Sequence, residues 1–323
     1  MVNETIISEV ILVGFPGIPE DLHNLVSTVM FLVYVFSLIA NGSVICLVAL
    51  NTYLHQPMYL VIANLATSNL LFDTVTLPKL IARYWFGSSS INFRLCLFQM
   101  FWIHYLGSVD ACLLMFMAVD RYVAISQPLR YNLIMTNRRT IIICSFFWIF
   151  TATPSNVAMS FQTSDIVLCS SSTNKINTLF CTHTAVLATA CTDVTFIRKV
   201  AFVCAMVVLL VSLGIIVLSY VLIIGEISSS SRSTNWRKLF YTCTTHLLVV
   251  ALYYVPRVFL YTISLSSVIV IRPDIHALIL FLYSVAPHMA NPVIYFLRTK
   301  EIRQTLRKVL QTIQYRVGHR FIC

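Results

Sequence analysis

Seven long apolar stretches constrain this chain more than any other feature. A membrane-spanning helix needs about 20 consecutive, mostly apolar residues. The stretches are Leu25–Leu50, Met58–Ile81, Leu95–Val119, Thr140–Met159, Phe196–Ile224, Leu239–Thr262 and Ile275–Leu297. They are continuous rather than alternating over about ten residues, which argues against a β-barrel. The sequence therefore predicts an all-α membrane protein: a seven-transmembrane helix bundle with no room for a second folded domain.

The overall composition excludes the common soluble classes. Of the 323 residues, 58% are hydrophobic and 11% charged, whereas soluble domains have about 45–50% apolar and about 25% charged residues. The sequence shows no internal repeat, which argues against a transporter built from inverted halves. The sequence has no nucleophile elbow, HExxH motif, phosphate-binding glycine loop or CxxC pair, so we expect no enzyme.

The distribution of Lys and Arg predicts the orientation. None precedes Lys79, whereas residues 298–323 contain seven. Because basic residues stay on the cytoplasmic side, residues 1–24 should be an extracellular tail and 25–297 the bundle, with the first span acting as a signal anchor. Residues 298–323 should form a short amphipathic cytoplasmic helix and a tail along the inner leaflet. The net charge of +10 then faces anionic membrane lipid and indicates no nucleic acid.

The predicted outer surface carries modification signals. Asn3 begins an Asn-Glu-Thr glycosylation sequon. Four cysteines, Cys96, Cys169, Cys181 and Cys191, fall at the outer ends of spans or in the loop between spans four and five. That compartment is oxidising, so disulfides are expected. Four cysteines allow three pairings, and their positions alone do not choose among them.

An Asp-Arg pair lies at the inner end of the third span. Asp120 and Arg121 belong to the run Met117–Tyr131, which reads MAVDRYVAISQPLRY. The charges could simply reach the membrane interface. Alternatively they form a switch, in which Asp120 holds Arg121 in one state and releases it to a cytoplasmic partner in another.

This run resembles the MAYDRYVAICxPLRY motif of olfactory (odorant) receptors, a group of rhodopsin-like G-protein-coupled receptors. Further matches, in chain order, are Asn41-Gly42 with the first-helix GN, Leu54–Tyr59 (LHQPMY) with LHxPMY, Lys238–His246 (KLFYTCTTH) with KAxSTCxSH, and Pro287–Tyr295 (PHMANPVIY) with PPxLNPxIY. The motifs cover nearly the whole chain. Gly14–Ile18 (GFPGI) and Gln99–His104 (QMFWIH) are similar to the fish-like class I branch, which is known for water-soluble odorants.

The resemblance implies a function and a disulfide pattern. A small external odorant would bind within the bundle, and a stimulatory olfactory-type heterotrimeric G protein would bind inside and raise cyclic AMP. The receptor would then lie in the plasma membrane of olfactory cilia. Cys96 should pair with Cys181, and Cys169 with Cys191. The residues expected to couple to the G protein are Asp120, Arg121, Tyr122, Asn291, Pro292 and Tyr295.

The ligand pocket should lie in the outer half of the bundle. Its candidate residues are His104, Gly107, Ser108, Tyr254, Arg257 and Tyr261. Arg257 is the most distinctive, because it follows Pro256 within an apolar span. It could reach up to water or headgroups. As an anion anchor it would select odorants with a carboxylate, sulfate or phosphate group.

Two residues depart from the family pattern near the middle of the membrane. Asn69 replaces the second-span Asp that helps bind sodium in many relatives, and Asp110 takes the place of the usual Glu. Asp110 lies eleven residues before Arg121, or about 16 Å along a helix. The site could hold a sodium ion through Asp110 and Asn69, a proton on Asp110, or neither. No other cofactor is expected.

Two other functions remain open at this point. One is a rhodopsin-like receptor for a lipid, hormone or metabolite outside the nose. The other is a channel or transporter, which would need several intramembrane charges or broken helices. Only Asp110 and Arg257 count as intramembrane charges in this interpretation.

Overall fold

The computed structural model describes residues 9–152, 175–229, 236–265, 272–299, 301–308 and 311. Seven long or medium helices make up the bundle: α1 (His23–Leu50), α2 (Pro57–Phe86), α3 (Phe93–Ser126), α5 (Asn137–Thr151), α8 (Thr195–Ser229), α9 (Trp236–Leu265) and α10 (Pro273–Arg298). The shorter elements are β1 (Glu9–Leu12), β2 (Ser90–Asn92), β3 (Lys175–Ile176), η1 (Glu20–Leu22), η2 (Thr52–Leu54), α4 (Tyr131–Ile134) and α7 (His183–Leu187). Residues 301–308 are also helical.

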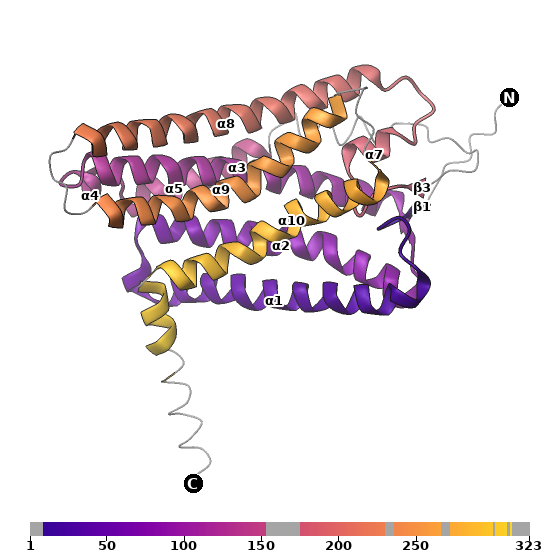
Figure 1. Cartoon of the computed structure of the whole chain (residues 1–323), viewed down its shortest axis with the longest axis horizontal. Coiled ribbons are helices and arrows are strands. Elements are labelled where there is room, and N and C mark those ends of the chain that lie inside the picture. The colour runs from indigo at the N-terminus through magenta and orange to yellow at the C-terminus, as the bar shows by residue number, and fades with distance from the viewer. Residues whose placement is uncertain are drawn as a thin grey trace, which may run out of the picture.

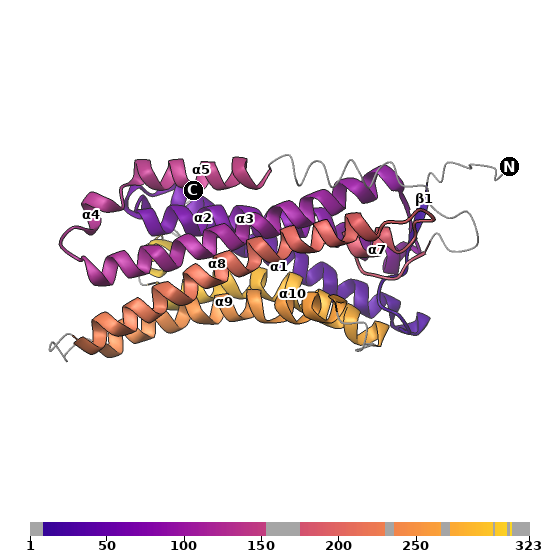
Figure 2. The ribbon, with the colours of Figure 1, turned by 90° about the horizontal axis from the view of Figure 1, so that it is seen from above.

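The long helices lie lengthwise beside one another (Figure 1). Strands β1 and β3 and helix α7 lie at one end, called the sheet end here, and α4 lies at the opposite end, called the α4 end. Helix α3 runs through the middle, in contact with α2, α5, α8 and α9 (Figure 2). Six helices of the described residues are long and apolar enough to cross a membrane. The predicted fourth span, Thr140–Met159, corresponds to α5 up to Thr151, and residues 153–159 lie outside the described residues.

The helices extend beyond the apolar stretches that predicted them. Helix α2 continues past Ile81 to Phe86 and ends at Gly87, whose φ of 65° lies in the left-handed region that glycine adopts without strain. Helix α3 passes through the Asp-Arg pair to Ser126. Hydropathy falls at the first charged residues, whereas the backbone hydrogen bonds of the helix continue through them. The predicted spans therefore end several residues before the helices do.

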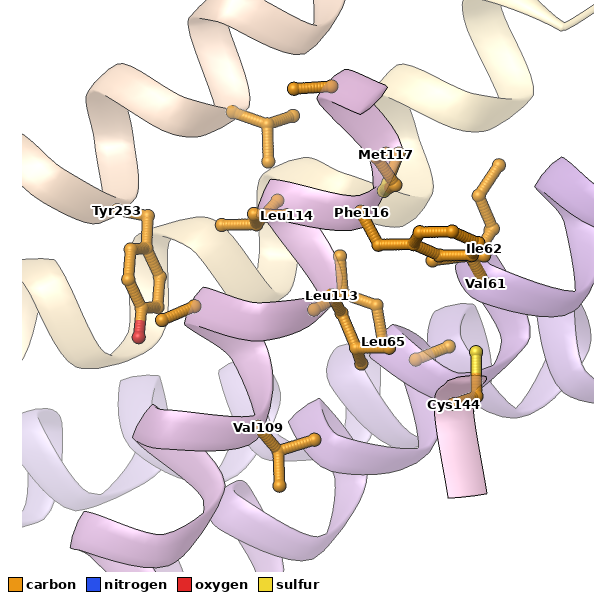
Figure 3. Packing of buried hydrophobic residues seen from close by; sticks show 14 of the residues in the cluster. Val61, Ile62, Leu65, Val109, Leu113, Leu114, Phe116, Met117, Cys144 and Tyr253 are labelled. Carbon is orange, nitrogen blue, oxygen red and sulfur yellow. The ribbon is translucent and has the colours of Figure 1, made fainter. Parts of the chain in front are cut away.

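The centre of the bundle is packed from apolar side chains of several helices. Figure 3 shows side chains of α2 and α3 interlocking beside Cys144 of α5. Leu65, Leu106 and Leu113 are each at most 1% exposed. Packing this close fixes the spacing of α2, α3 and α5, and it places the polar side chains of these helices against one another.

A small sheet, which the sequence did not predict, closes the sheet end. Strand β1 lies between β2, to which it is antiparallel, and β3, to which it is parallel. Val10 and Leu12 of β1 are 0% and 2% exposed and pack against the apolar cluster around Cys96 and Cys181. The chain is therefore mostly helical, and part of the predicted N-terminal tail is built into the fold.

A disulfide joins Cys96 of α3 to Cys181, as predicted from the family resemblance. Gln99 reinforces this connection: its Oε1 accepts from the backbone N–H of Cys181 at 2.9 Å, and its Nε2 donates to the carbonyl of Val75 in α2 at 2.9 Å. Cys191 is also disulfide-bonded, and Cys169, its predicted partner, lies outside the described residues. The segment before α7 is thus attached to both α2 and α3.

We predict that Cys96→Ser reduces the amount of folded protein at the cell surface. Losing a native disulfide typically costs about 2–5 kcal/mol of unfolding free energy. Surface labelling and the thermal midpoint of purified protein would measure the loss. Cys46→Ser is the control, because Cys46 is a free, exposed cysteine on α1. Equal surface levels for both variants would contradict a stabilising role for this disulfide.

Candidate functional site

Arg257 of α9 lies buried in the sheet-end half of the bundle. Its guanidinium carbon is 3.6 Å from the ring centre of Tyr253 and 5.2 Å from that of Tyr283. The residue is only 7% exposed, so it does not reach out to water. Among the described residues, no carboxylate lies within 4.0 Å of it, and its Nη1 has no hydrogen-bond partner. Arg257 is therefore a buried cation held by aromatic faces.

Two neighbouring tyrosines connect α9 to other helices. The hydroxyl of Tyr253 donates to the carbonyl of Gly107 in α3, and the hydroxyl of Tyr254 donates to Ser212 Oγ of α8 at 2.8 Å. A Cβ added to Gly107 would lie 3.8 Å from Arg257 Nη2, so α3 passes close to the guanidinium. Of the predicted pocket residues, Gly107 and Arg257 are thus brought together.

The other predicted pocket residues have different surroundings. Tyr254 is 2% exposed and its hydroxyl is engaged with α8, so the aromatic faces beside Arg257 come from Tyr253 and Tyr283, which the sequence did not single out. Tyr261 lies one helical turn after Arg257 on α9. Ser108 donates within its own helix, to the carbonyl of His104 at 3.0 Å.

His104 faces a second histidine at the sheet end. The ring centres of His104 and His183 are 6.2 Å apart, and His183 belongs to α7. The Nε2 atoms of both rings are buried without a hydrogen-bond partner in the described part of the chain. No sequence motif indicated His183, because only the fold brings α7 over α3.

A polar cluster that the sequence did not predict lies at the interface of α1, α2 and α10. Asp73 Oδ1 is 2.7 Å from His288 Nδ1, and Ser37 Oγ donates to Asp73 Oδ2 at 2.5 Å. Asp73 is 0% exposed and His288 2%. Asp73 and His288 are therefore two further ionisable side chains within the bundle, which the sequence interpretation did not count. His288 stands where the family motif PPxLNPxIY has its second proline, and that departure was the available signal.

Asp110 of α3 and Asn69 of α2 are buried near the middle of their helices, and with Asp73 and His288 they form what is called the central layer here. Asn69 Nδ2 donates to Asn41 Oδ1 at 3.2 Å. Asp110 Oδ1 and Asn69 Oδ1 are buried without hydrogen-bond partners among the described residues, as are Ser68 Oγ and Asn291 Oδ1. Carboxylate, amide and hydroxyl oxygens are ligands that hard cations accept. The donor chemistry fits the predicted sodium ion, but Asp110 also lies within electrostatic reach of His288.

At the α4 end, Asp120 is hydrogen-bonded to a tyrosine. The hydroxyl of Tyr131 donates to Asp120 Oδ1 at 2.8 Å. Burial and the negative charge of Asp120 raise the pKa of Tyr131 above its usual value, so it stays a donor. Within the described residues, no salt bridge of 4.0 Å or less joins Asp120 to Arg121, and Arg121 Nη2 lacks a hydrogen-bond partner. In this state Arg121 is not held by Asp120 through a close ion pair.

Asn291, Pro292 and Tyr295 lie on α10. Asn291 and Tyr295 are 3% and 4% exposed, and the Tyr295 hydroxyl has no partner among the described residues. Tyr122, the remaining predicted coupling residue, is half-buried on α3.

Comparison with known proteins identifies the family. The crystal structure of squid rhodopsin matches with a TM-score of 0.72 over 93% of this chain and 88% of that one, at 16% sequence identity, which shows a rhodopsin-like fold. A family model described as "Olfactory receptor" matches residues 30–312. The chain belongs to the olfactory receptor family. It is therefore a multi-pass G-protein-coupled membrane receptor and not an enzyme.

Curated relatives of the receptor extend over nearly its full length. Olfactory receptor 6B9 of Mus musculus is 34% identical over 316 residues, covering 96% of both chains. Olfactory receptor 2AP1 of Homo sapiens is 33% identical and covers 97% of the receptor and 99% of the relative. Olfactory receptor 52K1 of Homo sapiens is 33% identical and covers 93% and 94%.

Burial controls the charge of His183. It lowers the pKa of the imidazole to about 4 from a usual 6.5, and the positive charge of Arg198 acts in the same direction. His183 is therefore neutral at physiological pH. The receptor thus presents a neutral imidazole to His104 at the sheet end.

We predict that acid weakens the receptor through His183. A histidine with a lowered pKa takes up a proton on unfolding, so its contribution to stability is complete above about 6.5 and declines as the pH falls towards about 4. The thermal midpoint of the wild type should fall more steeply across this window than that of His183→Gln. Thermal unfolding of purified receptor at stepped pH measures the difference, and equal slopes would contradict the buried neutral state.

Proposed function

We propose that the receptor recognises a small odorant with an acidic head group in the sheet-end half of the bundle. The sheet end faces outward, and a stimulatory olfactory-type G protein binds at the α4 end to raise cyclic AMP. The observation that carries the ligand class is Arg257, a 7% exposed cation without a carboxylate within 4.0 Å among the described residues.

Energetics favour an anionic ligand at Arg257. Burying an unpaired charge costs several kcal/mol, and a cation–π contact returns only about 2 kcal/mol when desolvated. A carboxylate could accept two parallel hydrogen bonds from the guanidinium, which a neutral odorant of the same shape could not. The rings of Tyr253, Tyr283 and Tyr261 would then pack against the carbon skeleton, and His104 would supply a further hydrogen bond.

We also propose that the receptor belongs to the fish-like class I branch, which would be consistent with such a ligand. Its water-soluble odorants suit a polar anchor, and the proposal rests on the runs Gly14–Ile18 and Gln99–His104. The first run has a structural requirement of its own: Gly14 adopts a φ of 73°, and a Cβ there would lie 2.6 Å from the hydroxyl of Tyr84. Gln99 connects α2, α3 and Cys181.

Features of the α4 end support a G-protein interface. Leu129 is 97% exposed, and an open, shallow hollow is lined by residues 126–130. We place the contact with the G protein at this hollow, where Leu129 would be covered. Arg121 lies on the adjacent end of α3 with Nη2 unpaired in the described structure. We place the receptor in the plasma membrane of olfactory cilia, with Asn3, outside the described residues, as the glycosylation site.

We predict that Arg121→Ala abolishes cyclic AMP responses while part of the receptor still reaches the surface. The substitution removes the cation proposed to meet the G protein. A cyclic AMP reporter and surface labelling in the same cells would separate coupling from delivery. Arg138→Ala, on the first turn of α5, is the control. Full signalling by a well-expressed Arg121→Ala receptor would contradict the assignment.

We predict that Arg257→Ala weakens activation by an acidic agonist by about 2–5 kcal/mol, the range for removing one partner of a buried charge pair. Arg257→Lys should restore only part of this, because lysine lacks the planar fork. Dose–response curves for a carboxylic acid and its methyl ester measure the effect.

Arg272→Ala is the control for this prediction, since Arg272 is exposed and already paired with Asp274 at 2.8 Å. Two results would contradict the anion anchor. One is equal activation of the wild type by an acid and its ester, and the other is an unchanged acid potency in Arg257→Ala.

A further inference from the structure

The pair Asp73–His288 connects helices that are far apart in sequence. The two residues are 215 positions apart, and their side chains meet at 2.7 Å between α2 and α10. Helix α1 joins the pair through Ser37, which donates to Asp73, and through Asn41, whose Nδ2 donates to the carbonyl of His288 at 3.1 Å. The ring of Phe72 packs edge-on against His288, with ring centres 4.9 Å apart. The pair is thus fixed in place from three helices.

Two carboxylates in this central layer require positive charge. Asp73 and Asp110 are 0% and 1% exposed, so water does not solvate them. A buried carboxylate without a compensating charge costs several kcal/mol. Among the described residues, His288 is the only basic side chain within 4.0 Å of Asp73, and none lies that close to Asp110. Asp110 is within electrostatic reach of both His288 and Arg257.

We propose that His288, as an imidazolium, is an internal cation that takes the place of a bound sodium ion in this receptor. It bonds Asp73 directly and lies within electrostatic reach of Asp110, whose charge Arg257 also helps to balance. Two carboxylates, one imidazolium and one guanidinium together have no net charge.

A covalently attached cation has a different dependence on conditions from a mobile one. A bound ion stabilises the folded state only as far as its concentration exceeds its dissociation constant. The imidazolium of His288 is present at any salt composition and is held by the same helices that it joins. The proposal therefore predicts that the stability of the receptor does not depend on sodium. This inference does not rest on the ligand class proposed above, because no odorant is involved.

A neutral His288 predicts the opposite behaviour. Asp110 Oδ1 and Asn69 Oδ1, which lack partners in the described structure, would then be free to bind sodium beside an uncompensated carboxylate. The two possibilities differ in a measurement that needs no ligand and no G protein.

The experiment compares thermal midpoints of purified, full-length receptor in sodium chloride and in N-methylglucamine chloride at equal ionic strength. N-methylglucamine is too large to enter a closed helix bundle, so only a sodium site distinguishes the two salts. We expect the same midpoint for the wild type in both. A wild-type midpoint that rises by about 3 °C or more in sodium, as a binding energy near 1 kcal/mol would produce, overturns the proposal.

Two variants that break the same pair separate charge from mere packing. His288→Gln removes the cation and leaves two carboxylates, so its midpoint should rise in sodium by about 3 °C or more. Asp73→Asn removes one carboxylate and leaves the cation beside Asp110, so it should stay insensitive to sodium. A purely structural role for the pair would give both variants the same salt response, and that result would contradict the proposal.

Poor folding of His288→Gln would not prevent the test. The double variant His288→Gln/Asp73→Asn keeps a neutral hydrogen-bonding pair and leaves Asp110 without an imidazolium, so it should also be stabilised by sodium. Adding Asp110→Asn should abolish that response. A double variant that is insensitive to sodium would show that His288 does not occupy the role of the ion.

Discussion

The lipid interior offers no water, so each polar group within the bundle must find its partner on the protein. Lipid tails are as apolar as leucine, so the hydrophobic effect gives the helices little reason to associate, and van der Waals packing and polar contacts between helices must provide it. In this receptor, hydrogen bonds and charges provide that reason at chosen points. One such point joins α1, α2 and α10 through polar side chains: Ser37, Asn41, Asp73 and His288. Apolar contacts alone would leave these helices freer to slide along one another.

The elements that the sequence predicts well are those stabilised within themselves. A membrane helix satisfies its own backbone hydrogen bonds, so the seven apolar stretches were enough to locate α1, α2, α3, α5, α8, α9 and α10, although not their exact ends. The disulfide Cys96–Cys181 is different, because the cysteines are 85 residues apart and three pairings were open. Resemblance to a family chose the pairing, and physical reasoning from the sequence did not.

The contacts between helices could not be read in advance. Asp73 and His288 are 215 residues apart, and neither position shows which residue it faces until the helices are packed. The same holds for Arg257, whose apolar sequence neighbours suggested an outward reach as readily as a buried anchor. Tyr253 lies one turn before Arg257 on the same helix, whereas the contact with Tyr283 follows from how α9 meets α10. Strand β1 was not predicted, because four residues that pair with two other short strands have too little sequence pattern of their own.

Asp110 connects the proposed ligand site with the central layer, since it lies within electrostatic reach of both Arg257 and His288. An anion at Arg257 would claim part of the positive charge that Asp110 now shares. With His288 as the proposed cation, Asp110 would then depend more strongly on it, and this attraction would draw α3 towards α10. A ligand shifts a conformational equilibrium only through its different affinity for the two states. Because α3 also carries Arg121 at the α4 end, a change in how α3 meets α10 is a physical route by which an acid at one end could alter the surface at the other.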